Sequence, residues 1–121
     1  MTTRTPTVIH PGSVIDLDHA TLYTWSGLLN GDDGSPISGS DFPDRTVHIL
    51  GTFGSGGSVN LEGSNDGTNW LPLTDPQGNA ITKTATALEM VTETPRYIRP
   101  RVTAGDGTTD ITVIVFARTP R

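Results

Sequence analysis

Apolar and polar residues alternate over several short stretches of this chain, as they do in a β-strand with one buried face. Over residues 46–53, Val47, Ile49, Gly51 and Phe53 form one set and the intervening residues form the other. Because successive side chains of a strand point to opposite faces, the first set is expected to point into a core. The same alternation marks further core positions at Val59, Leu61, Ile98, Pro100, Val102 and Ala104.

No long stretch has the spacing of an amphipathic helix. The best short candidate, residues 85–91, contains threonine and is followed by Pro95, and both disfavour a helix. Strands are expected near residues 13–17, 21–27, 46–53, 57–63, 69–74, 80–85, 88–93, 97–104 and 110–117. The pattern therefore predicts an all-β fold, an antiparallel β-sandwich or jelly-roll-like barrel of about eight to nine short strands.

The last two predicted strands differ in character. Pro100 cannot donate a hydrogen bond to a neighbour, so strand 97–104 is expected to be an edge strand or to carry a bulge. In strand 110–117 the apolar residues fall on both faces, since Ile114 and Phe116 lie opposite the set that contains Val113. This pattern predicts a central strand, or a strand whose outer face a partner covers.

Turn-forming residues mark the connections between these strands. Residues 29–44 are long and turn-rich, which predicts a functional or mobile loop. Residues 64–68 are expected to form a tight hairpin in which Gly67 adopts positive φ, and residues 105–109 are expected to join the last two strands in the same way. The glycine-rich residues 51–57 lack the helix that a phosphate-binding loop requires, which indicates a flexible or bulged β connection.

Composition limits the chain to one small domain. It has 121 residues, 33% of them hydrophobic, with 20 threonines and no cysteine. Without cysteine, a disulfide scaffold, a thiolate metal site and a cysteine nucleophile are excluded. Residues 1–12 hold two prolines and little apolar pattern, which predicts an extended N-terminal arm or a frayed terminus, with residues 13–121 as the sandwich domain. No apolar run is long enough for a membrane span, and the N-terminus lacks a signal peptide's apolar centre, so Sec export is not expected.

Charge is distributed unevenly along the chain. Residues 1–75 carry nine acidic and two basic side chains, whereas residues 76–121 carry six basic and four acidic ones. The asymmetry is compatible with a partner of mixed charge or with a solvated face. The net charge of −5 argues against nucleic acid as a partner.

The sequence offers little material for catalysis. His10, His19 and His48 have no nearby nucleophile, and no catalytic signature occurs. Acidic side chains crowd one loop, at Asp32, Asp33, Asp41 and Asp44, without the spacing of a calcium loop. Because aspartate also caps turns, we expect a protein that is not an enzyme, with no metal and no cofactor.

The aromatic residues suggest a core and one binding face. Trp25 and Trp70 are expected in the core or at its edge. Tyr97, Arg99 and Arg101 share the outward face of one strand, and tyrosine and arginine are frequent anchors of protein interfaces. A plain exposed strand face is the alternative interpretation.

Two stretches resemble a known class of viral protein. They are LEGSNDGTNWLPLTD at residues 61–75 and PRYIRPRVTAGDGTTD at residues 95–110, which runs into an apolar strand. Together they are similar to the head decoration, or capsid cement, proteins of tailed bacteriophages, which have β-sandwich or jelly-roll folds. The resemblance spans about residues 45–118 and leaves the first forty unmatched.

The resemblance implies a non-enzymatic structural protein that is made in the host cytoplasm and decorates the capsid exterior. It would bridge neighbouring major capsid protein subunits and associate with itself as a dimer or trimer, without binding nucleic acid or membrane. The expected contact residues are Thr5, Thr7 and Ile9 in the arm and Tyr97, Arg99 and Arg101 on the strand face. Such a protein binds the assembled shell but not its separated parts, and so stabilises the shell.

Two alternatives remain. One is another virion β module, in a tail, a neck or a fibre attachment. The other is a carbohydrate-binding β-sandwich, since the phrase SNDGxxW also occurs in discoidin-like modules, although those are usually longer than this chain. A carbohydrate-binding module would need Trp25 or Trp70 exposed on a concave face.

Overall fold

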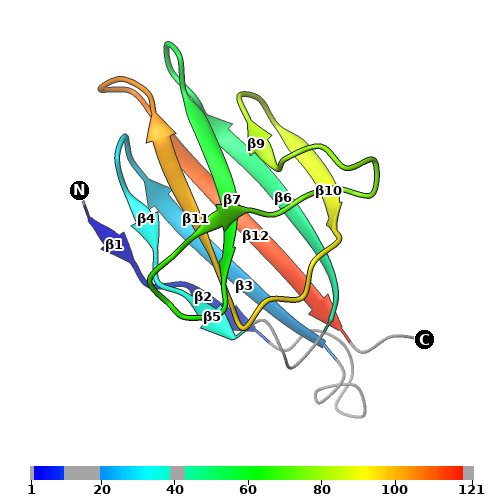
Figure 1. Cartoon of the computed structure of the whole chain (residues 1–121). Helices are drawn as coiled ribbons and strands as arrows, with labels where there is room; N and C mark the ends of the chain where they lie inside the picture. The colour runs from blue at the N-terminus through cyan, green and yellow to red at the C-terminus, as the bar shows by residue number, and fades with distance from the viewer. Residues whose placement is uncertain (1, 10–19, 39–42, 119–121) are drawn as a thin grey trace.

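Two β-sheets pack face to face in the computed structural model, which describes residues 2–9, 20–38 and 43–118 (Figure 1). The five-stranded sheet has the order β10-β6-β12-β3-β2. Its strands are Ala87–Val91, Asp44–Thr52, Asp110–Arg118, Ala20–Leu28 and Thr7–Ile9. These strands pair antiparallel throughout.

The seven-stranded sheet has the order β1-β4-β11-β7-β8, with β5 on β11 and β9 on β7. The strands in that order are Thr3–Arg4, Asp33–Gly34, Tyr97–Ala104, Ser58–Ser64, Leu71–Pro72, Ile37–Ser38 and Thr82–Lys83. Only β1 pairs parallel, with β4, among these described pairs. The predicted all-β sandwich is confirmed, in its open form rather than as a closed barrel.

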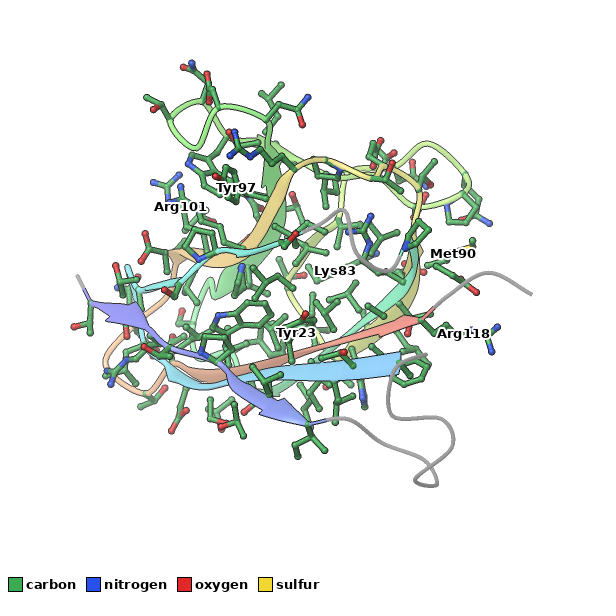
Figure 2. The ribbon with its side chains drawn as sticks, turned by 90° about the horizontal axis from the view of Figure 1, so that it is seen from below. Tyr23, Lys83, Met90, Tyr97, Arg101 and Arg118 are labelled. Carbon is green, nitrogen blue, oxygen red and sulfur yellow. The ribbon has the colours of Figure 1, made fainter. Side chains whose placement is uncertain are left out.

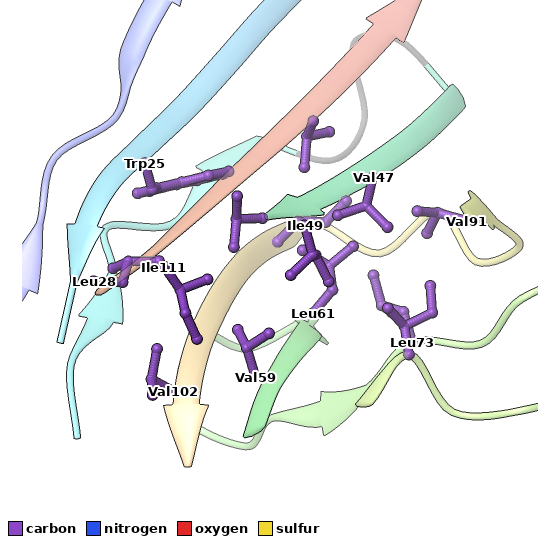
Figure 3. Close-up of a cluster of buried hydrophobic side chains, with 14 of the residues drawn as sticks. Trp25, Leu28, Val47, Ile49, Val59, Leu61, Leu73, Val91, Val102 and Ile111 are labelled. Carbon is purple, nitrogen blue, oxygen red and sulfur yellow. The ribbon is translucent and has the colours of Figure 1, made fainter. Parts of the chain in front are cut away.

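The core lies between the sheets and follows the predicted alternation over the middle of the strands (Figure 3). Gly51 and Ala104, which were also expected to point inward, are exposed, because they lie near the end of β6 and at the end of β11. Val47 and Ile49 of β6 belong to the same cluster as Val59 and Leu61 of β7, and all four are almost completely buried. The remaining core residues are Trp25, Leu28, Ile37, Leu73, Ile81, Val91, Ile98, Val102, Ile111, Val113 and Val115. Most of the predicted strands are present with shifted ends, although the strand expected near 13–17 lies outside the described residues.

β11 and β12, the last two predicted strands, both lie inside their sheets. β12 is central, paired with β6 on one side and β3 on the other, as its apolar pattern predicted. β11 is not an edge strand, because β7 flanks one side and β4 and β5 flank the other. Pro100 fits because it lies between the short pairings made by β4 and β5, where no ladder hydrogen bond is required of it. The expected bulge occurs after Val102.

Two loop predictions were wrong. Residues 29–44 were expected to be one long loop, but they contain β4 and β5, which pair with β11 and bury Ile37. Residues 105–109 were expected to form a hairpin, but β11 and β12 belong to different sheets. The loop instead crosses the sandwich, and Asp106 accepts hydrogen bonds from Thr108 Oγ1 and the Ser55 amide of the neighbouring crossing loop. These bonds lower the pKa of Asp106 to about 2.

The hairpin expected at residues 64–68 joins β7 to β8. Gly67 has a φ of 77°, as predicted, while neither Asn65 nor Asp66 takes positive φ. The Asp66 carboxylate accepts hydrogen bonds from the amides of Asn69 and Thr68, from the Asn69 side chain and from Ser64 Oγ. These bonds hold the pKa of Asp66 far below its ordinary value and fix the loop that presents Trp70.

Candidate functional site

The face predicted to bind a partner lies on the outside of the seven-stranded sheet. Along β11, Tyr97, Arg99 and Arg101 alternate with buried residues, so all three point away from the core. Figure 2 shows Tyr97 and Arg101 on this side and Tyr23 between the sheets. The predicted shared face is therefore present, and we call Tyr97, Arg99, Arg101, Glu62, Asp33 and Trp70 the charged face.

Arg99 is the centre of the charged face rather than a free anchor. Its Nε donates to Glu62 Oε1 at 3.1 Å, and its Nη1 donates to Asp33 Oδ2 at 3.3 Å. Its guanidinium carbon also lies 4.2 Å from the centre of the Trp70 ring, which is a cation–π contact. With 19% of its side chain exposed, Arg99 is committed to contacts within the chain.

Arg101 and Tyr97 are more accessible. The Arg101 side chain is 50% exposed, and its Nη1 lies 3.9 Å from Glu62 Oε2. Tyr97 is half-buried, and the Arg96 guanidinium lies 4.9 Å from its ring centre. Of the three predicted contact residues on β11, these two have the surface to offer a partner.

The beginning of the chain is tied to the same sheet by two aspartates. Asp32 accepts hydrogen bonds from the Thr2 amide at 2.9 Å and from Arg4 Nε at 3.2 Å, and Thr3 Oγ1 donates to Asp33 at 2.7 Å. Burial by itself raises the pKa of Asp32, but the hydrogen bonds that Asp32 accepts from the amides of Leu29 and Thr2 and from Arg4 outweigh burial and lower that pKa. Residues 2–9 are therefore held against the sandwich, with β1 paired to β4 and β2 paired to β3.

The other predicted contact residues, Thr5, Thr7 and Ile9, are all exposed. Thr5 lies between β1 and β2, where the chain passes from one sheet to the other. Thr7 and Ile9 pair with Thr24 and Leu22 on the outer side of the five-stranded sheet. The structure thus places Thr7 and Ile9 on the outer face opposite the face that carries Tyr97, Arg99 and Arg101. It does not bring the two predicted contact sets together.

The outer side of the five-stranded sheet carries two cross-strand rows without Asp, Glu, Lys or Arg. One row runs Ile9, Leu22, Phe116, Thr46, Met90, and the other runs Thr7, Thr24, Ile114, His48, Leu88. We call these ten residues the uncharged face. The sequence indicated only the part of this face on β12, where Ile114 and Phe116 lie on the outer side. The residues that β2, β6 and β10 contribute could not be identified without knowing the strand order.

Catalytic or metal-binding groups are not assembled in the part of the chain that the structure describes. His48 lies in the uncharged face, while His10, His19 and Asp41 lie outside the described residues. Asp44 Oδ2 lies 3.0 Å from Arg118 Nε. Asp32 and Asp33 accept the hydrogen bonds from residues 2–4 and Arg99 described above. Within the described ranges no three His, Asp or Glu side chains gather as metal ligands.

The two tryptophans have different roles. Trp25 is fully buried, and its Nε1 donates to the carbonyl of Ser35 at 3.1 Å, so it offers no platform for a ligand. Trp70 is half-buried on the outer side of the seven-stranded sheet, with Arg99 over one face of its ring. The expectation of a core position is confirmed for Trp25 and is wrong for Trp70, which does not pack against the core.

An open groove of about 480 Å³ runs beside the loop that presents Trp70. It is lined mainly by Ser64, Asn65, Asn69, Leu71, Pro95 and Glu93. Burial raises the pKa of Glu93, but hydrogen bonds from the hydroxyl and amide of Thr74 outweigh it and lower that pKa. Glu93 is the titratable side chain among the lining residues, so the groove lacks an acid–base pair.

Comparison with solved structures finds a similar fold in the SPBc2 prophage-derived protein YomS, with a TM-score of 0.61. The two chains are 13% identical, and the match covers 81% of this chain and 93% of that one. At this identity the likeness shows a shared fold. No protein-family model and no curated protein matches the sequence.

Two further solved structures match less well. Peruvianin-I, a cysteine peptidase from Thevetia peruviana latex, has a TM-score of 0.46 at 13% identity, covering 87% of this chain and 53% of that one. Fe(II)-HppE has a TM-score of 0.40 at 12% identity, covering 93% and 55%. Scores this low carry no argument about function.

Among the described residues the structure has no helix that is long and apolar enough to cross a membrane.

Proposed function

We propose that this chain is a non-enzymatic structural protein of a bacteriophage virion that decorates the outside of the capsid. In this role it bridges neighbouring subunits of the major capsid protein. It is made in the host cytoplasm and acts on the assembled particle.

The observation that carries the proposal is the way the two decoration-like stretches combine. Residues 61–75 contribute the end of β7, the Trp70 loop and β8, and residues 95–110 contribute β11. β7 and β11 are neighbours in one sheet, with Tyr97 opposite Ser64 and Arg99 opposite Glu62. The stretches that carry the resemblance therefore build one surface, which is the charged face without Asp33. The similar fold of a prophage-derived protein supports a phage origin.

The charged face suits contact with a protein lattice. Arg99 holds Glu62, Asp33 and Trp70 in a fixed arrangement, so little conformational freedom is lost on binding. Arg101 and Tyr97 lie beside this rigid centre and keep part of their side chains exposed to a partner. Arg and Tyr are enriched among the residues that dominate binding energy. Each contact can be modest, because a protein that engages two subunits gains from effective concentration.

The test is binding of the purified chain to expanded, undecorated heads of the phage that encodes it, measured by co-sedimentation and imaged by electron microscopy. We expect saturable binding at regular lattice positions. Arg101→Gln is expected to weaken binding about tenfold or more. The matched control is Gln77→Glu, which changes the net charge equally on an exposed loop outside the charged face.

Failure of the wild-type chain to bind any head lattice would overturn the proposal. Binding at a tail, a neck or a fibre attachment would replace it with the other virion role. Equal weakening by Arg101→Gln and Gln77→Glu would refute the assignment of the charged face while leaving decoration itself in place.

A further inference from the structure

The acidic side chains of the charged face are already bound by donors of the same chain. Glu62 accepts hydrogen bonds from Arg99 Nε at 3.1 Å and from Asn60 Nδ2 at 3.4 Å. Asp33 accepts them from Thr3 Oγ1 at 2.7 Å and from Arg99 Nη1 at 3.3 Å. The side chains of Glu62 and Asp33 are only 4% and 11% exposed. A partner that docks on this face therefore finds both carboxylates shielded and engaged.

Two arginines at the ends of the outward row are not engaged in this way. Arg96 is exposed, lies over the Tyr97 ring and forms no ion pair with the described residues. Arg101 is half exposed, and the 3.9 Å from its Nη1 to Glu62 Oε2 is too long for a hydrogen bond. Asp66, in the adjoining loop, is bound by donors of that loop. The charged groups that a partner touches here are thus guanidinium groups.

Given the proposed capsid role, on which this rests, we propose that the capsid surface under the charged face presents carboxylate side chains, which pair with Arg101 and Arg96. A guanidinium has five N–H donors and no acceptor, so a surface that covers it must supply acceptors or bury an unpaired charge. A carboxylate supplies two oxygens in the matching geometry and also neutralises the charge. Five residues of extended chain separate the two arginines, which places the two acidic sites about 16 Å apart on the partner.

The net charge of the chain favours the opposite kind of partner. At −5 the chain as a whole is attracted to a basic surface. At an ionic strength of about 0.1 M, however, charges more than about 10 Å apart are largely screened, so the side chains in direct contact dominate. The two kinds of partner predict opposite signs. A negative charge placed at position 101 weakens binding to an acidic surface and strengthens binding to a basic one.

The first test measures binding of the full chain to immobilised, expanded and undecorated heads of the phage that encodes it, in about 0.1 M NaCl. Arg101→Glu is expected to weaken binding at least about tenfold more than Gln77→Glu, because it places like charges together in the contact. Gln77 is the matched control, since it is exposed on a loop outside the charged face. Arg101→Lys keeps the positive charge and is expected to lose less affinity than Arg101→Gln.

The second test identifies the partner's carboxylate by coupling it to an amine. The chain has a single lysine, Lys83, whose Nζ is paired with Glu89 at 2.7 Å, so its own background is small. Arg101→Lys and Arg96→Lys each place an amine in the charged face, and a carbodiimide joins an amine to a carboxylate that it touches. Mass spectrometry of the treated, decorated heads is expected to find position 101 or 96 joined to an aspartate or glutamate of the capsid subunit. The control, Gln77→Lys, is expected to give no such product.

Heads that bind Arg101→Glu as tightly as the wild type, or more tightly, would overturn the acidic partner. Binding of Arg101→Lys and Arg96→Lys without coupling to the capsid subunit at either position would overturn it as well. In both cases the wild-type chain still binds heads, so the proposed capsid role stands. If the wild-type chain binds no head at all, the capsid role fails and the acidic partner fails with it.

Discussion

Replacing Arg99 with methionine removes the guanidinium that pairs with both Glu62 and Asp33 and stacks on Trp70. Glu62 is the residue most affected, because only 4% of its side chain is exposed and it cannot turn to water. Asn60 Nδ2 at 3.4 Å and Arg101 Nη1 at 3.9 Å would remain near it. We therefore expect Arg99→Met to destabilise the whole sandwich rather than only the surface.

The size of the effect follows from these contacts. A hydrogen bond between charged groups contributes about 1.5–3 kcal/mol, and the cation–π contact about 0.5–1 kcal/mol. Methionine keeps the apolar stem, and Asn60 and Arg101 still solvate Glu62 in part, so the contributions do not add fully. We expect a loss of about 2–4 kcal/mol in the free energy of unfolding, which corresponds to a fall in Tm of about 8–16 °C for a chain of this size.

The assay is urea unfolding at pH 7, followed by tryptophan fluorescence and circular dichroism. Arg101→Met serves as the control, because its side chain is half exposed and lies farther from Glu62, and it is expected to cost less than about 0.5 kcal/mol. A double-mutant cycle with Glu62→Gln is expected to give a coupling energy above about 1 kcal/mol. If Arg99→Met unfolds within about 0.5 kcal/mol of the wild type, the role given to Arg99 is refuted.

Two further predictions concern the contacts that join the sheets and hold the chain's beginning. Gly34→Ala is expected to cost about 1–3 kcal/mol in urea unfolding, because its Cβ would come within 2.6 Å of Pro100 and Trp25; an unchanged midpoint would contradict this packing. Because the pKa of Asp32 is lowered on folding, its contribution to stability is complete above the unfolded value of about 3.9 and is lost as the pH falls through the folded value. The NMR shift of the Thr2 amide is therefore expected to titrate with a midpoint below 3.8, and a midpoint above 4 would contradict the contact.

The parts of the fold that depend on neighbouring residues in the sequence could be predicted. The alternation of Val47 and Ile49 places them in the core, since strand geometry alone determines which side chains share a face. The apolar character of both sides of β12 predicted its central position. The same alternation also makes Arg45 point inward, where it is buried and its Nη2 donates to the Glu93 carbonyl at 3.2 Å.

Strand pairing over long sequence distances could not be predicted. The turn residues of 105–109 suit a hairpin and a crossing between sheets equally well, because turn chemistry does not determine which strands pair. The turn-rich composition of residues 29–44 concealed β4 and β5, which pair with β11 through one and two residue pairs respectively. Residue patterns in the loop itself carry no signal for such contacts.

The candidate surfaces were predicted in part for the same reason. Strand alternation placed Tyr97, Arg99 and Arg101 on one face, but the partners of Arg99 lie 37 and 66 residues away in the sequence, at Glu62 and Asp33. Whether an outward arginine is free or engaged therefore depends on strand order. The same order separates the Thr7 and Ile9 surface from the β11 surface by the thickness of the sandwich.

We propose that this protein works by adhesion to a capsid lattice through its charged face. An electron cryo-microscopy map of the native virion, at a resolution that traces strands, tests it most directly. We expect this chain on the outer surface of the head, with Tyr97 and Arg101 against the major capsid protein. A map that shows the heads without this chain, or with its charged face open to solvent, would contradict it.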